Sequence, residues 1–193
     1  MSKTRLEAFS DGVFAIIITI MVIELHVPQG AEWADLATSE VAGPFLAYVL
    51  SFVLLAIYWN NHHHMLHMAD RVNGEVLWAN MTLLFWLSLV PAATSWLGKF
   101  PTSAVPTAVY GVSQLIPGFG WLWLKEAIIR VQGPQSKLAA AVGRDTKGRL
   151  SAALYTSSIG LAFVSTWLSD AIFVIVALMW LIPDRRIEKR LEA

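Results

Sequence analysis

The sequence lacks cysteine altogether, and only 15% of its 193 residues are charged. Without cysteine the chain has no disulfide, no thiolate nucleophile and no cysteine ligand for a metal ion. It also lacks the H-E-x-x-H zinc motif, and its 14 basic and 14 acidic residues cancel, so its charge indicates no nucleic-acid partner. We therefore expect neither an enzyme nor a protein with a bound cofactor.

Apolar residues are abundant instead, at 56% of the chain with a mean hydropathy of +0.56. This is more apolar surface than one soluble core of this size needs, so lipid must cover part of it. Six apolar segments approach the roughly 20 residues that a helix needs to cross a bilayer. They are Phe9–Val27, Gly43–Trp59, Val76–Trp96, Val105–Leu124, Leu150–Trp167 and Ala171–Ile182. The last two are short, and the Ser169-Asp170 break between them predicts a tight hairpin.

The basic residues predict the orientation of these segments, because loops rich in lysine and arginine stay cytoplasmic. With the N-terminus inside, 13 of the 14 basic residues fall on the cytoplasmic side and Lys99 alone falls outside. We expect one all-α membrane domain, residues 1–193, with six transmembrane helices and both termini in the cytoplasm. Within it, residues 126–149 form a cytoplasmic linker and residues 184–193 a cytoplasmic tail.

Polar residues stand at the start of the first apolar segment, where Arg5, Ser10 and Asp11 occur. Such groups at the mouth of a membrane helix are costly unless they hydrogen-bond inside the protein. Farther along, Ile16 and Ile20 recur at the spacing of one helical stripe. Apolar periodicity alone leaves open whether that stripe faces lipid or protein, but the polar cluster on the same helix favours protein.

The opening Arg5-x-x-x-Phe9-Ser10-Asp11 resembles the R-x-x-x-F-S-D signature of the endosomal and lysosomal potassium channel family, whose bacterial members have six helices. The similarity runs through the first three segments, and beyond Lys99 only the helix count is similar. The resemblance implies a homotetramer in a prokaryotic cell membrane, with the first helix lining a central pore for monovalent cations and K⁺ as the permeant ion. The family lacks the usual T-V-G-Y-G filter, and this chain has no such run either.

Four positions of the first segment match the family's aliphatic and threonine layers: Ile16, Thr19, Ile20 and Ile23. Four copies of Ile16 around an axis can close a pore by sterics or by dewetting, so we expect the constriction there. The Thr19 hydroxyl either replaces part of an ion's hydration shell or bonds to a carbonyl of its own helix, and both interpretations stay open.

The charged members of the signature are expected to serve architecture rather than permeation. If Arg5 and Asp11 both lined the pore, their charges would oppose each other, whereas pairing with other helices satisfies them. The resemblance implies partners on the second and third helices, and the matching polar residues are Trp59, His62 and Asn80.

Three other features of the sequence each allow two functional interpretations. His63 and His67 lie four apart and could chelate a metal, but no third acidic or thiol ligand sits at a diagnostic spacing, so we expect no metal site. Glu24 either concentrates cations at an outer mouth or is simply solvated. Asp11 and His62 could also form the relay of a proton-coupled or proton-conducting transporter, but such carriers usually break a helix at the midplane, and the first segment is unbroken.

Overall fold

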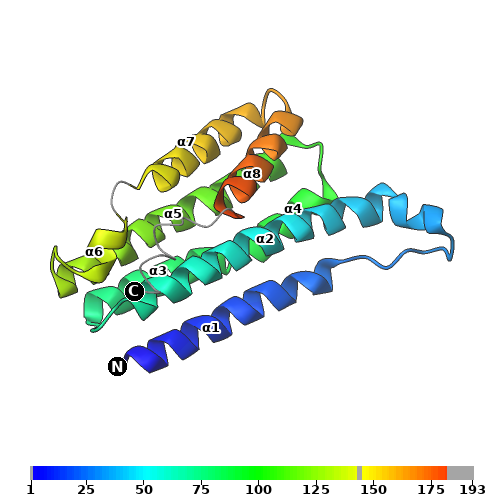
Figure 1. Cartoon of the computed structure of the whole chain (residues 1–193). Helices are drawn as coiled ribbons and strands as arrows, with labels where there is room; N and C mark the ends of the chain where they lie inside the picture. The colour runs from blue at the N-terminus through cyan, green and yellow to red at the C-terminus, as the bar shows by residue number, and fades with distance from the viewer. Residues whose placement is uncertain (1, 143–144, 182–193) are drawn as a thin grey trace.

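The structure, a computed structural model, describes residues 2–142 and 145–181. Over these residues the chain is helical, with no strand (Figure 1). Its elements are α1 Lys3–Ile20, η1 Met21–Glu24, η2 Trp33–Ala37, α2 Ser39–His67, α3 Gly74–Leu87, α4 Val90–Lys99, α5 Ala104–Gln132, α6 Lys137–Val142, α7 Thr146–Leu161 and α8 Thr166–Leu181, where η marks a 3₁₀ turn. The expected all-α fold is confirmed.

The helices form a bundle with α1 along one side and the α7–α8 pair on the other (Figure 1). One apolar core joins α1 to α2, α3 and α5 through residues such as Phe14, Leu55 and Leu83. A second core joins α2, α4 and α5 to α7 and α8, with Tyr110 and Phe173 at its centre. Because α2 and α5 contribute to both cores, they connect α1 to the rest of the bundle.

The third apolar segment is two helices rather than one. Pro91 has no N–H for the carbonyl of Leu87, so α3 stops at Leu87 and α4 starts at Val90. The Ser88 hydroxyl donates to the Phe85 carbonyl at 2.7 Å, which satisfies a backbone acceptor at this break.

Three stretches of the described chain are long and apolar enough to cross a membrane: Lys3–Glu24, Ser39–His67 and Gly74–Lys99. The apolar helix Thr166–Leu181 is shorter. These stretches agree with the first three expected spans, and the count of six stays a prediction.

The hairpin between the last two segments forms, but its predicted position was wrong. Helix α7 ends at Leu161 and α8 begins at Thr166, so Ser169 lies inside α8. The buried Ser169 hydroxyl donates to the Ser158 carbonyl at 2.7 Å. In an apolar helix pair a serine can hold two helices together in this way, and the sequence suggested a chain break instead.

The expected linker at 126–149 is largely helical where the structure describes it. Helix α5 continues to Gln132 and ends at Gly133, whose φ of 90° favours glycine. Helix α6 follows, and Asp145 then caps α7 by accepting a hydrogen bond from the Gly148 N–H at 3.0 Å. The expected tail at 184–193 lies outside the described residues.

Candidate functional site: the first helix and its polar anchor

Helix α1 has one buried and one exposed face. Leu6, Phe14 and Ile17 are 1–4% exposed and face the bundle. On the other side Ile16 is 64% exposed and Ile23 is 77% exposed. Ile20, between them, is 47% exposed, so the described chain leaves much of the isoleucine stripe uncovered, and either lipid or another protein surface must cover it.

A buried chain of hydrogen bonds, which we call the polar anchor, joins Ser10 of α1 to α3 and α2. The Asn80 amide nitrogen donates to Ser10 Oγ at 3.0 Å, and the Asn80 amide oxygen lies 2.7 Å from His62 Nε2. Since that oxygen only accepts, Nε2 carries the proton. Ser10 Oγ in turn donates to the Leu6 carbonyl at 2.8 Å. All three side chains are at most 1% exposed, and each is satisfied.

A second bond holds the next residue of α1. The Trp59 indole N–H donates to Asp11 Oδ1 at 2.9 Å, and Trp59 is 41% exposed. Successive residues point about 100° apart around a helix, so Ser10 reaches α3 while Asp11 reaches α2. Bonds in two directions from adjacent residues fix the rotation of α1 about its own axis.

Arg5 was expected to pair with the polar residues of the second and third helices, but it lies outside the polar anchor. It is exposed and makes no hydrogen bond or ion pair with a residue that the structure describes. The physical reason is helical phase: Arg5 precedes Asp11 by six residues, about one and two-thirds turns, so the two point in different directions. Ile16 is eleven residues away, about three turns, so Arg5 lies on the same exposed face as the stripe. Phe9, 47% exposed, lies beside it rather than in the core.

Thr19 is exposed next to the stripe, and its hydroxyl donates to the Ala15 carbonyl at 2.8 Å. The proton is thus used within the helix, while the oxygen lone pairs remain available on the exposed side. Helix α1 gives way to the tighter η1 at Met21, so Ile20 and Ile23 lie three apart around a 3₁₀ turn and nearly eclipse.

Glu24 at the end of η1 is neither merely solvated nor unpaired. Its carboxylate accepts from the Ser95 hydroxyl at 2.6 Å and lies 3.7 Å from Lys99 Nζ. Sequence reasoning missed Ser95 because a serine within an apolar segment gives no indication of its partner. These contacts tie the end of α1 to α4.

Three further histidines, His63, His64 and His67, lie along the end of α2. The rings of His63 and His67 stack with centroids 6.2 Å apart. Over residues 2–142 and 145–181 no group of three or more histidine, cysteine, aspartate or glutamate side chains is placed to hold a metal. His62 and Asp11 bond to different partners, Asn80 and Trp59, rather than to each other.

Comparison with known proteins gives this geometry its context. The family described as endosomal/lysosomal potassium channel TMEM175 matches residues 5–91. A protein named potassium channel from a Chryseobacterium species is 47% identical over 192 residues, 100% of this chain and 99% of that relative. The human endosomal/lysosomal proton channel TMEM175 is 33% identical over 96 residues, 44% of this chain and 19% of the relative.

A solved structure shares the fold. The crystal structure of a lysosomal potassium-selective channel TMEM175 homolog from Chamaesiphon minutus matches with a TM-score of 0.75 and 26% identity, covering 93% of this chain and 96% of that one. The predicted family is therefore confirmed, and these relatives are ion channels rather than enzymes. The chain is a membrane protein and belongs to the TMEM175 channel family.

Proposed function

We propose that the chain forms a potassium-preferring cation channel, in which four copies of α1 surround a pore in a prokaryotic cell membrane. Rings of Ile16, Ile20 and Ile23 constrict this pore, and Ile16 forms the narrowest ring. The filter is aliphatic, without a T-V-G-Y-G loop, and both chain termini lie in the cytoplasm. Monovalent cations pass as the rings open, and no cofactor takes part.

The observation that carries this proposal is the combination of a fixed and an uncovered face on α1. Ser10 and Asp11 bond to α3 and α2, so the helix cannot easily roll. That fixed rotation directs the isoleucine stripe away from the chain's own core. A fourfold arrangement of copies would cover the stripe and place identical side chains in rings.

Thr19 has a defined place in this arrangement. Its proton is engaged by Ala15, so its oxygen presents lone pairs, which is the polarity that a cation requires. One turn away, the aliphatic rings offer no such group. Potassium preference would then depend on Thr19 and on the width of the rings.

Two experiments test the proposal. The first reconstitutes the purified chain in liposomes and measures currents under potassium and sodium gradients. The second uses the absence of native cysteine: Ile23→Cys should cross-link under mild oxidation, because four stripes converge on one axis. Ile175→Cys on α8, where the native side chain is 53% exposed, is the matched control and should remain monomeric on a denaturing gel. Equal cross-linking of both variants would contradict the axial position of α1.

The second candidate is a proton-conducting channel or transporter that uses Asp11 and His62. What favours it is that the human relative is named a proton channel. A pH-sensitive dye inside the liposomes separates the two candidates. Proton flux that persists without potassium and disappears in Asp11→Asn would favour this alternative.

A further inference from the structure

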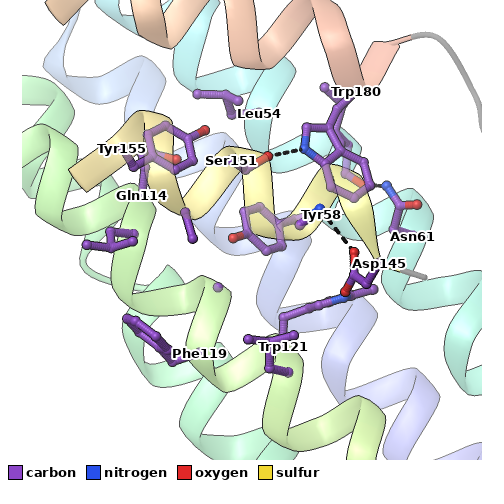
Figure 2. Close-up of a pocket in the computed structure, with 16 residues that line it drawn as sticks. Leu54, Tyr58, Asn61, Gln114, Phe119, Trp121, Asp145, Ser151, Tyr155 and Trp180 are labelled. Atoms are coloured by element: carbon purple, nitrogen blue, oxygen red, sulfur yellow. Dashed lines mark hydrogen bonds between the residues drawn. The ribbon is translucent and has the colours of Figure 1, made fainter. Parts of the chain in front are cut away.

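A cavity of about 100 Å³ lies between α2, α5, α7 and α8, and no residue of α1 lines it (Figure 2). Its lining is mostly apolar and includes the aromatic rings of Tyr58, Phe119, Trp121, Tyr155 and Trp180. Phe119 is 58% exposed, so the cavity reaches the surface of the chain there. Because an engineered apolar cavity of about 150 Å³ binds benzene, this cavity approaches the size that takes a single ring. It is separate from the proposed pore, and the channel proposal leaves it unexplained.

Several polar side chains of the lining are already engaged within the chain. Asp145 Oδ2 accepts from Lys125 Nζ at 3.0 Å, and Asp145 Oδ1 accepts from the Gly148 N–H at 3.0 Å. The Trp180 indole N–H donates to Ser151 Oγ at 2.8 Å (Figure 2). The charge of Asp145 is thus compensated by Lys125, which favours an uncharged ligand in the cavity.

Three other polar side chains of the lining are left without a good partner: Tyr58 on α2, Gln114 on α5 and Tyr155 on α7. Neither tyrosine hydroxyl hydrogen-bonds to a residue that the structure describes, although Tyr155 is only 5% exposed. Gln114 is 2% exposed, and its amide nitrogen makes only a long bond of 3.4 Å to Ser113 Oγ. Buried polar groups are normally paired. A molecule in the cavity could therefore satisfy groups from three helices at once.

We propose that this cavity binds a small neutral aromatic alcohol of the size of phenol, whose ring occupies the apolar space and whose hydroxyl bonds to Tyr58, Tyr155 or Gln114. An aromatic ligand can pack edge to face on the lining, as the rings of Tyr58 and Trp121 already do at 6.3 Å between centroids. Water would bond to the same polar groups but would leave the apolar wall without favourable contacts. The bound molecule would hold α7 against α2 and α5.

Two glycine substitutions provide a matched test of the apolar space. Gly118 lines the cavity, and a Cβ added there would meet no atom within 4 Å, so Gly118→Leu should fill the cavity in a folded chain. Gly160→Leu adds the same side chain at an exposed position of α7, also with no atom within 4 Å of the Cβ and away from the lining. Ala152→Leu, on the α7 wall of the cavity, is a second filling variant should Gly118→Leu fail to fold.

Two tyrosine substitutions test the hydrogen bonds. Tyr155→Phe deletes a hydroxyl that has no partner among the described residues, so it should leave Tm without ligand no lower than that of the wild type. Tyr110→Phe is the control, because the Tyr110 hydroxyl lies outside the lining and within 2.9 Å of Ser51 Oγ. It should lower Tm without ligand and keep the response to the ligand. Tyr58→Phe is the second variant of the first kind.

The experiment measures thermal unfolding of the full chain in a neutral detergent with equal concentrations of phenol, toluene or cyclohexanol, so its readout does not depend on conductance. Toluene has the ring without the hydroxyl, and cyclohexanol has the hydroxyl without the aromatic ring. We expect phenol to raise Tm by several degrees in the wild type, in Gly160→Leu and in Tyr110→Phe, because a ligand of the native state stabilises it. Gly118→Leu or Ala152→Leu should lose most of that shift. Tyr155→Phe or Tyr58→Phe should reduce the phenol shift toward the smaller toluene shift.

Four results would overturn the proposal. A phenol shift undiminished in the filling variants would place the ligand elsewhere, for example in the detergent micelle. Equal shifts with phenol and toluene in the wild type would exclude recognition of the hydroxyl. Equal shifts with phenol and cyclohexanol would exclude recognition of an aromatic ring. A wild type whose Tm does not rise with phenol would leave the cavity to water.

Discussion

The two ends of α1 are held by different kinds of interaction. The N-terminal half is fixed by the buried polar anchor of Ser10, Asn80 and His62. The C-terminal half relaxes into a 3₁₀ turn and is tied to α4 by Glu24 and Lys99, whose side chains are 47–48% exposed. Buried bonds in an apolar environment are costly to break, whereas exposed ion pairs contribute little. The chain therefore fixes the direction of the stripe by buried hydrogen bonds at one end, whereas the other, more adjustable end combines the buried Met21 with exposed polar contacts.

The largest expected effect comes from breaking the polar anchor. Asn80→Leu, similar in size, leaves His62 Nε2–H and Ser10 Oγ without their partner, at about 1–3 kcal/mol for each buried group. Thermal melting and size-exclusion chromatography in detergent should show a strongly destabilised protein. Asn61→Leu is the control, because among the residues that the structure describes the Asn61 side chain bonds only to the Ile57 carbonyl of its own helix. Equal losses of thermal stability in both variants would show that the polar anchor stabilises the fold no more than a hydrogen bond within one helix does.

A smaller loss should follow from removing the bond to Asp11. Trp59→Phe keeps an aromatic ring but deletes the N–H that donates at 2.9 Å, and because Trp59 is 41% exposed the cost should lie below the roughly 1.5–3 kcal/mol of a buried bond to a charged group. Trp78→Phe is the matched control, since Trp78 is 71% exposed. A melting temperature of Trp59→Phe no lower than that of the control would show that Asp11 does not need this donor.

Substitutions in the middle of α1 should change the ion current more than the stability of the fold. Ile16→Ala removes an exposed side chain, so the fold loses little, but it should widen the proposed constriction and raise potassium conductance several-fold. Ile20→Ala and Ile23→Ala should have smaller effects. Ile175→Ala on α8 removes an isoleucine that is also more than half exposed, outside the proposed pore, and should leave conductance unchanged. Conductance in Ile16→Ala equal to the wild type, at equal protein density, would move the constriction elsewhere.

Thr19→Val should change selectivity more than total current, because it deletes the oxygen lone pairs while retaining the shape. Reversal potentials under mixed potassium and sodium gradients measure this. Thr156→Val is the control: its hydroxyl donates to the Ala152 carbonyl at 2.8 Å, which is the same bond within a helix outside the proposed pore. An unshifted reversal potential would leave Thr19 with only its hydrogen bonds to the Ala15 and Ile16 carbonyls of its own helix.

The sequence predicted the parts of this site that follow from short motifs. The existence of the first three spans, though not their bounds, could be predicted from their apolar length, and the family resemblance implied Trp59, His62 and Asn80 as the partners of the signature. Arg5 was placed wrongly because membership of a motif says nothing about helical phase. The Ser169 bond and the contact of Ser95 with Glu24 could not be predicted, since one serine can end, bend or join helices.

The smallest effect is expected at the adjustable end. Lys99→Met removes the 3.7 Å ion pair with Glu24 but leaves the Ser95 bond in place, so the loss should be at most about 0.5 kcal/mol. Lys3→Met is the counterpart at the N-terminal end. Lys3 makes a similar 3.7 Å pair with Glu7 but also donates to the His67 carbonyl at 2.9 Å, so its loss should be greater. Melting both variants at low and high salt separates the two ends, because salt screens an exposed ion pair more than a hydrogen bond to a carbonyl. A larger and salt-insensitive loss in Lys99→Met would show that the C-terminal end of α1 is as firmly fixed as the other.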